Sequence, residues 1–142
     1  MQDDDYTVLY VIARTDMLSF TGTDSERKAG LPCAQTGHAA NQMVYQARQK
    51  DEPELNAMLT TWENETGMGF GTEIVLGAHY SKIRQLVDQA KLMGFHASMV
   101  KDPEYPLRDG NTMHFIPVET CAYIFGYKNQ LAPLLSGMDL LP

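Results

Sequence analysis

The strongest constraint on the fold is one unbroken apolar run near the start of the chain. Residues 7–13 read TVLYVIA, a continuous stretch of β-branched and apolar side chains without polar alternation. A strand of this kind has to be covered on both faces, which is typical of a central strand in an α/β protein. The chain must therefore supply helices for two faces of a sheet.

The remaining pattern supplies these helices and three more strands. Apolar residues at helical spacing predict helices over residues 32–49, 54–64, 81–93 and 130–136. Runs rich in β-forming residues predict strands over residues 73–78, 96–101 and 120–126. This order predicts an α/β fold: one domain over residues 1–142, a three-layer α/β/α sandwich with a four-stranded mixed sheet.

Two segments fall outside this framework. Residues 1–5 form an acidic tail, and residues 103–118 are predicted to be a long loop that holds several polar and aromatic side chains. Loops of this length in compact domains are usually functional or disordered. We therefore expect the segment 103–118 to belong to the functional site.

The helix predicted over residues 32–49 carries two stripes. Small side chains recur on one face, which favours close packing of that face against the sheet. They are Cys33, Gly37, Ala40, Val44 and Ala47. The neighbouring stripe of Gln35, His38, Gln42 and Tyr45 is expected to aim an amide and an imidazole along the edge of a cleft. A hydrogen-bonded core histidine is the alternative interpretation of His38.

Composition excludes several classes of protein. The net charge of −7 argues against a general nucleic-acid coat protein, although it permits a local basic patch. No apolar run reaches the length of a membrane span, and the acidic start does not resemble a signal peptide. Cys33 and Cys121 stand alone, which predicts buried thiols in the reducing cytoplasm. The four histidines lack paired ligand spacing, so no metal site is predicted.

Polar side chains collect where the predicted strands end. Arg14 and Asp16 follow the first strand, and Asp102 follows the third. The start of the long helix adds Gln35 and His38. Because ligands of α/β sheets bind at the carboxyl ends of the strands, this end of the sheet is the predicted site.

Four strings at these positions resemble the type-2 peptidyl-tRNA hydrolase family. They are Arg14-Thr-Asp-Met, Gly30 followed by Ala34-Gln-Thr-Gly-His-Ala-Ala40, Ser98-Met-Val-Lys-Asp102, and Thr112 eight residues before Thr120. The order agrees over roughly residues 6–142, and the string Gln-x-x-His-Ala-Ala is the most specific. The resemblance implies an α/β/α sandwich, commonly dimeric, that hydrolyses the ester joining a peptide to the 3′ end of tRNA without a cofactor.

The resemblance also implies the members of the site. The implied catalytic residues are Gln35, His38, Asp102, Thr112 and Thr120. The family's lysine directly after the glycine is Leu31 in this chain, so the cation is expected from Arg27 or Lys28.

The family's Asp-x-Gly-x-Thr string raises a second question. The segment between Asp102 and Thr112 is several residues longer than the family's and contains its own Asp109 beside Gly110. We favour Asp102 for the family role because it ends the predicted strand, and we assign Asp109 to substrate binding.

The chemistry of ester hydrolysis is compatible with these residues. The reaction needs a water molecule that is positioned and partly deprotonated, and donors for the developing oxyanion. Asp102 or His38 suits the first task, whereas Thr112, Thr120 and Gln35 suit the second. The phosphates of the acceptor end would be held by Arg14, Arg27, Lys28 and Arg108. Two alternatives stay open: a nucleotide- or protein-binding module on the same fold, and a hydrolase of another ester or amide.

Overall fold

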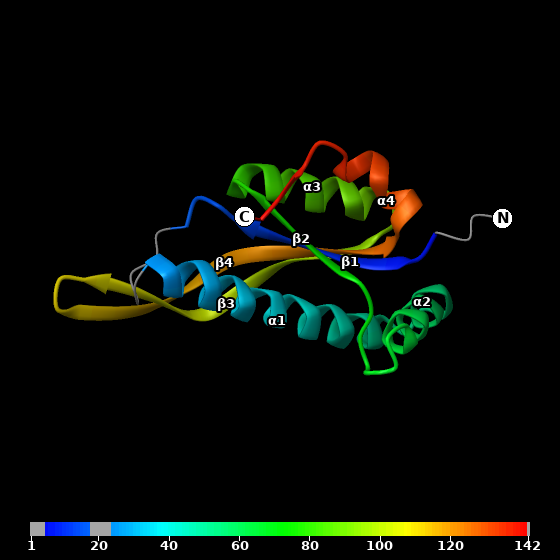
Figure 1. The fold of residues 1–142 in the computed structure, drawn as a ribbon, viewed down its shortest axis with the longest axis horizontal. Helices are drawn as coiled ribbons and strands as arrows, with labels where there is room; N and C mark the ends of the chain where they lie inside the picture. The colour runs from blue at the N-terminus through cyan, green and yellow to red at the C-terminus, as the bar shows by residue number, and fades with distance from the viewer. Residues whose placement is uncertain (1–4, 18–23, 142) are drawn as a thin grey trace.

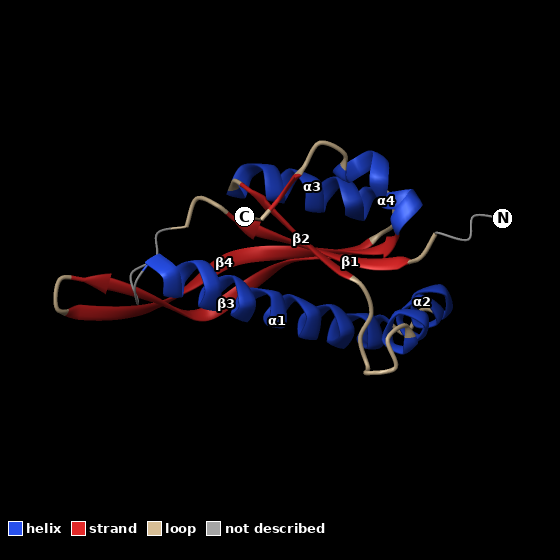
Figure 2. Ribbon diagram, in the orientation of Figure 1, coloured by secondary structure: helices blue, strands red, loops and turns tan. Residues whose placement is uncertain are grey.

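The computed structural model describes residues 5–17 and 24–141, with side chains except those of residues 24–32 and 107–108. The elements in chain order are β1 (Thr7–Arg14), α1 (Asp24–Lys50), α2 (Pro53–Asn64), β2 (Glu73–Ala78), α3 (Tyr80–Leu92), β3 (His96–Asp109), β4 (Thr112–Tyr127), α4 (Lys128–Leu135) and β5 (Asp139–Leu140). Figure 1 shows α1 and α2 on one side of the sheet and α3 and α4 on the other (Figures 1 and 2). In the described part of the chain, no helix is both long and apolar enough to cross a membrane.

The sheet is mixed, as predicted, but has five strands instead of four. Its order is β3-β4-β1-β2-β5, with β1 parallel to β2 and the other neighbours antiparallel. The prediction missed β5 because a two-residue edge strand is too short to show any periodicity. The α/β class and the central position of β1 are confirmed.

Side chains of β1 alternate between two apolar clusters. Val8, Tyr10 and Ile12 contact the cluster under α3 and α4, whereas Leu9 and Val11 contact the cluster under α1 and α2. All five are buried. The unbroken apolar run therefore reflects a strand that is covered on both faces, as its sequence indicates.

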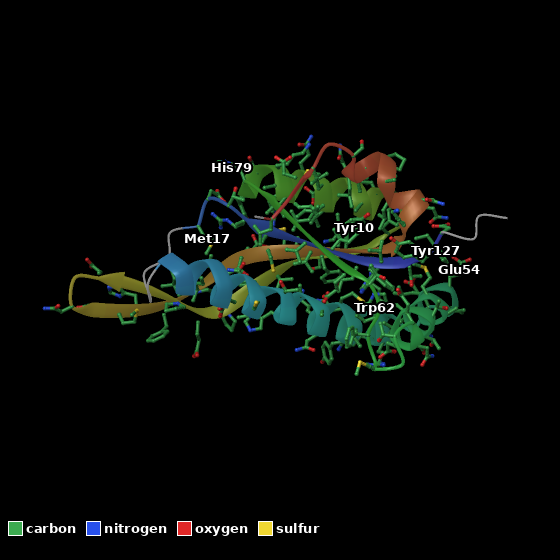
Figure 3. All side chains as sticks on the ribbon, viewed as in Figure 1. Tyr10, Met17, Glu54, Trp62, His79 and Tyr127 are labelled. Atoms are coloured by element: carbon green, nitrogen blue, oxygen red, sulfur yellow. The ribbon has the colours of Figure 1, made fainter. Side chains whose placement is uncertain are left out.

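Trp62 anchors α2 to the apolar cluster under α1 and α2. Its indole Nε1 donates to the carbonyl of Thr72 at 2.9 Å, and its ring packs edge-on against Phe125 with 6.0 Å between centroids. Figure 3 shows Trp62 on the α2 side of the sheet and Tyr10 on the opposite side. The predicted apolar face of this helix is confirmed.

The segment 103–118 is not a loop, so that prediction is wrong. β3 and β4 continue as a two-stranded hairpin that turns at Gly110 and Asn111 and extends past the first turns of α1 (Figure 1). Gly110 has a φ of 60° and is the first turn residue, where hairpins favour glycine. Pro103 and Pro117 both lie at a β-bulge, one of the few places where a sheet tolerates proline.

The start and the buried face of α1 also differ from the prediction. The helix begins at Asp24, so Pro32 lies inside it and not in its first turn. The side chains buried against the sheet are Gln35, Ala39, Met43 and Ala47. Cys33 and Gly37 are exposed, and with Ala40 they line a groove of about 510 Å³ beside β2. The predicted stripe is thus correct only in part: Ala47 is buried and Ala40 and Val44 pack against the cluster under α1 and α2, whereas Cys33 and Gly37 border open space.

A buried polar network joins the end of α1 to the sheet. His96, 4% exposed, has its Nε2 atom 3.0 Å from the carbonyl oxygen of Met43 and its Nδ1 atom 2.9 Å from Nζ of Lys50. The carbonyl needs a donor and the ammonium needs an acceptor, so the imidazole is neutral with its proton on Nε2. Burial lowers the pKa of His96, and the charge of Lys50 lowers it further.

The exposed position of Gly37 leads to a stability prediction. A Cβ atom at Gly37 would meet nothing within 4 Å, and glycine inside a helix costs roughly 0.5–1 kcal/mol relative to alanine. Gly37→Ala should therefore raise the free energy of unfolding in urea by about that amount. Ala39→Leu is the matched control, because overpacking the buried face should lower it by about 1–3 kcal/mol. If Gly37→Ala instead lowers the free energy of unfolding, Gly37 faces the sheet, as the sequence predicted.

His96 makes stability depend on pH. In the unfolded chain its pKa is about 6.5, and in the folded chain it is lower, so the unfolded state takes up the proton first as the pH falls. The contribution of His96 to the free energy of unfolding should be constant above about pH 6.5. It should decline as the pH drops from about 6.5 towards 5. In chemical unfolding experiments at several pH values, His96→Gln should remove most of this decline. An equal slope in both proteins would contradict the assignment.

Candidate active site

The structure places the candidate residues on four elements. Arg14 ends β1, Gln35 and His38 lie in α1, Asp102 and Asp109 lie in β3, and Thr112 and Thr120 lie in β4. Arg27 and Lys28 belong to α1 and Arg108 belongs to β3, but their side chains lie outside the described part of the structure. The end of β1 and the middle of β4 are adjacent, since Ala13 pairs with Cys121.

Thr120 occupies a β-bulge in β4. Val100 of β3 pairs with Cys121 and Lys101 pairs with Glu119, so Thr120 is the extra residue between them. Bulges redirect a side chain and are common next to active sites. The side chain of Thr120 is fully buried, and its hydroxyl lies 3.8 Å from the sulfur of Cys121.

Cys121 links this bulge to α1. Its thiol lies 3.6 Å from the carbonyl oxygen of Gln35, and the Gln35 side chain is itself buried. Burial raises the pKa of Cys121 to about 11, so the sulfur is a neutral thiol and not a nucleophile at physiological pH. Cys121, which was not among the residues predicted for the site, thus contacts both Thr120 and the main chain of Gln35.

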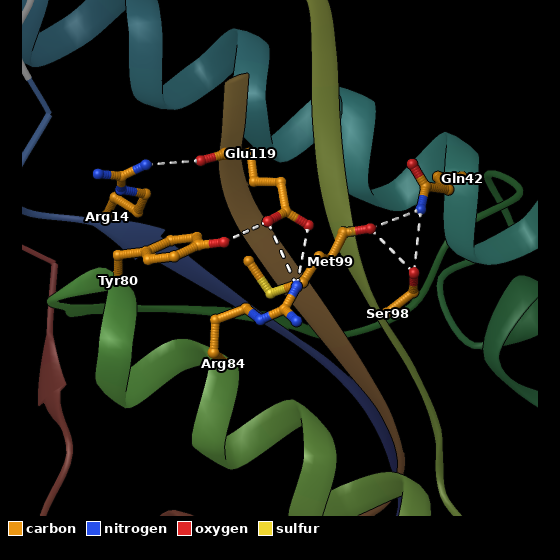
Figure 4. Close-up of polar contacts among 7 residues, drawn as sticks. All are labelled: Arg14, Gln42, Tyr80, Arg84, Ser98, Met99 and Glu119. Atoms are coloured by element: carbon orange, nitrogen blue, oxygen red, sulfur yellow. Dashed lines mark hydrogen bonds and ion pairs between the residues drawn. The ribbon is translucent and has the colours of Figure 1, made fainter. Parts of the chain in front are cut away.

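Arg14 is held by three partners at the same end of the sheet, two of which, Tyr80 and Glu119, are drawn in Figure 4. Its guanidinium contacts Asp16 at 3.0 Å, donates to the carbonyl of Glu119 at 3.1 Å, and lies 4.6 Å from the ring centre of Tyr80. Burial raises the pKa of Asp16, but the hydrogen bond and the charge of Arg14 outweigh this effect and lower it overall. The cation at the end of β1 is therefore fixed in position.

Glu119 connects this cation to α3. Its carboxylate accepts a hydrogen bond from the hydroxyl of Tyr80 and lies 3.4 Å from the guanidinium of Arg84 (Figure 4). The hydrogen bond to Glu119 is the main cause of the raised pKa of Tyr80. Sequence reasoning missed all three residues. The available signal for Glu119 was its place directly before Thr120, whereas no motif marked Tyr80 or Arg84.

Asp102 lies within β3 and not at the end of the strand. It pairs with Val118, and its carboxylate accepts a hydrogen bond from the N–H of Glu104 at 2.9 Å, which shapes the second bulge. Asp102 is partly buried. It lies two residues after Val100 in β3, next to the bulge at Thr120. His38, by contrast, is exposed on α1 and is not a core histidine.

Asp109 and Thr112 lie far from Thr120. They pair with each other at the tip of the hairpin, where the Asp109 carboxylate is 3.6 Å from Nε2 of His114. Eight residues of extended strand separate Thr112 from Thr120, which corresponds to about 27 Å. The structure therefore brings Gln35, Thr120 and Arg14 to one edge of the sheet but keeps Thr112 and Asp109 apart from them.

This edge has the composition of a site for polar chemistry without a bound metal. Within residues 5–17 and 24–141, no group of three or more His, Cys, Asp or Glu side chains could hold a metal ion. The guanidinium of Arg14 contacts the carbonyl of Glu119, directly before the buried Thr120, and Asp102 pairs with Val118, two residues before Thr120. Guanidinium, hydroxyl and carboxylate groups can orient water and stabilise an oxyanion.

Comparison with known proteins identifies the family. The family model described as peptidyl-tRNA hydrolase PTH2 matches residues 7–141, from the first residue of β1 to just beyond β5. No curated protein gives a match. The matched range contains every element that builds the edge described above. The chain therefore belongs to the peptidyl-tRNA hydrolase PTH2 family, whose activity is the hydrolysis of peptidyl-tRNA.

Proposed function

We propose that this chain cleaves the ester of peptidyl-tRNA at the edge formed by Thr120, Gln35, Asp102 and Arg14. The observation that carries the proposal is the β-bulge that buries Thr120 beside Cys121, whose thiol reaches the main-chain carbonyl of Gln35, next to the end of β1. The chain is proposed to work as a single three-layer α/β/α domain, in the cytoplasm where translation generates its substrate. Binding of the tRNA acceptor end and assembly as a homodimer are further parts of the proposal.

The proposed reaction is direct attack of water on the ester carbonyl. Asp102 accepts a proton from the water as its oxygen bonds to the carbonyl carbon. The hydroxyl of Thr120, assisted by the amide of Gln35, donates to the oxygen that becomes negative. The bond to the ribose oxygen then breaks, that oxygen takes the proton, and the peptide leaves as a carboxylic acid. Arg14 supplies fixed positive charge for the adjacent phosphate.

His38, Thr112 and Asp109 take different roles in this proposal. His38 is exposed on the same helix as Gln35, which suits contact with the substrate better than proton transfer inside the site. Thr112 and Asp109, at the hairpin tip, suit recognition of a more distant part of the tRNA. Arg27, Lys28 and Arg108 remain proposed phosphate contacts, because Leu31 leaves the family's lysine position without a charge.

Thr120 provides the most direct test of the mechanism. The measurement is the release of a labelled N-blocked amino acid from its tRNA by purified protein. Thr120→Val keeps the shape of the side chain and removes the hydroxyl, so kcat should fall about 10²–10³-fold. Thr120→Ser is the matched control and should retain most of the activity. Near-normal turnover by Thr120→Val, with its melting temperature unchanged, would exclude Thr120 from the reaction.

The two aspartates provide a second test in the same assay. Asp102→Asn should abolish turnover while tRNA binding and the melting temperature stay nearly unchanged, because a neutral amide cannot accept the proton of the water. Asp109→Asn should mainly raise the substrate concentration needed, because Asp109 lies at the exposed hairpin tip. The opposite result would transfer the family's aspartate role to Asp109 and would require the hairpin to bend towards Thr120.

A further inference from the structure

We infer that a groove along β3, about 22 Å from Gln35 along α1, binds a phosphate group of the tRNA substrate. The inference rests on the proposed function, because it assumes that the ester is cleaved near Gln35 and Thr120. It adds a second contact with the tRNA, remote from the reacting bond.

The groove lies between the ends of two helices at the edge of the sheet. β3 is the outermost strand, and α1 and α3 flank it on opposite faces. The cavity has a volume of about 380 Å³. It is lined by Gln46, Gln49 and Lys50 of α1, Lys91 of α3, and Ala97, Ser98 and Tyr123 of the sheet.

Two positive charges in this groove lack acidic partners. No carboxylate in the described part of the chain lies within ion-pair distance of Lys50 or Lys91. Lys50 instead contacts the imidazole of His96 at 2.9 Å, and the charge of Glu52 acts on the same ring in the opposite sense. The lysines Lys82, Lys101 and Lys128 of the described chain also have no carboxylate within ion-pair distance, so it is the shared groove that distinguishes Lys50 and Lys91. Two unpaired ammonium groups lining one groove, in a chain of net charge −7, favour an anionic ligand.

Gln46 adds a neutral donor to the two lysines. Its Oε1 atom already accepts a hydrogen bond from the hydroxyl of Tyr123 and lies 3.4 Å from Nε2 of Gln42. The NH₂ end of Gln46 is therefore the end that can donate to a ligand. Ammonium and amide donors around a common space suit the oxygens of a phosphate.

The position of the groove favours a phosphate within a nucleic-acid strand. Gln35 and Lys50 are 15 positions apart on one continuous helix, a rise of about 22 Å. Stacked nucleotides advance only a few ångströms each, so a strand whose end lies at Gln35 places a phosphate several nucleotides away near Lys50. Gln42 lies between the two ends and bonds the carbonyl of Met99 at 3.0 Å, so the intervening helix stays close to β3.

Lys91 is the residue to change, because Lys50 also supports His96 in the core. We compare the wild type with Lys91→Gln and with Lys128→Gln, a matched loss of one charge on α4. The first measurement is the Kd of deacylated tRNA at several salt concentrations. Lys91→Gln should weaken binding several-fold and reduce the slope of log Kd against log salt by about one, whereas Lys128→Gln should change neither.

The second measurement distinguishes weaker binding in this groove from a loss of catalysis at the proposed active site. It uses whole peptidyl-tRNA and a short ester, an N-acetylated amino acid on adenosine, which cannot reach the groove. The ratio of kcat/KM for the whole substrate to that for the short ester should fall several-fold in Lys91→Gln and stay constant in Lys128→Gln.

Three results would overturn the inference: an unchanged salt slope in Lys91→Gln, an equal loss on both substrates, or binding of inorganic phosphate alone that Lys91→Gln weakens while tRNA binding stays intact. If the wild type cleaves neither substrate, the proposed function fails instead. The tRNA-binding measurement would still test the groove.

Discussion

Burial of β1 on both faces is the constraint on which the rest of the structure depends. Its apolar residues alternate between two clusters, and burying one Val, Leu or Ile side chain contributes roughly 1.5–3 kcal/mol. Neither cluster can form unless helices cover both sides of the sheet. α1 and α2 cover one side and α3 and α4 cover the other, and β1 pairs with β4 on one edge and with β2 on the other. The proposed site lies where this central strand ends.

The site results from a local break in the regular pairing next to β1. In an unbroken ladder, Thr120 and Cys121 would point to opposite faces of the sheet. The bulge opposite Val100 and Lys101 interrupts that alternation: the Thr120 hydroxyl lies beside the Cys121 sulfur, and this sulfur contacts the main-chain carbonyl of Gln35. The residue before the bulge, Glu119, holds Arg14 through its carbonyl and reaches α3 through its carboxylate. One irregularity thus arranges a buried hydroxyl and a fixed cation from two different strands.

The distribution of ion pairs explains how an acidic protein can act on a polyanion. At long range, a chain of net charge −7 repels tRNA, so binding depends on local positive charge. Arg14 is paired with Asp16 but lies at the end of β1, where its position is set by three contacts. In the described part of the chain, Lys50 at the end of α1 and Lys91 on α3 have no carboxylate within ion-pair distance, and both line the groove about 22 Å along α1 from Gln35. In the proposed function, the fixed cation Arg14 would orient the substrate near the reacting ester. Lys50 and Lys91, farther away, would increase the affinity for tRNA.

The sequence by itself determined the α/β class, the central strand, the apolar face of α2 and the family, because these depend on local periodicity and on contiguous motifs. It also proposed Gln35, Thr120 and Arg14, which belong to such motifs, as site residues, and their roles stay predictions. Only the tertiary structure decided which face of α1 is buried, since Gly37 and Ala39 differ little in size and the choice depends on what lies opposite. It also converted residues 103–118 into a hairpin, because prolines are tolerated at a bulge or on an edge strand. The contacts of Glu119 with Tyr80 and Arg84, and the place of Lys91 in its groove, could not be predicted from the sequence, because they depend on residues far apart in the chain.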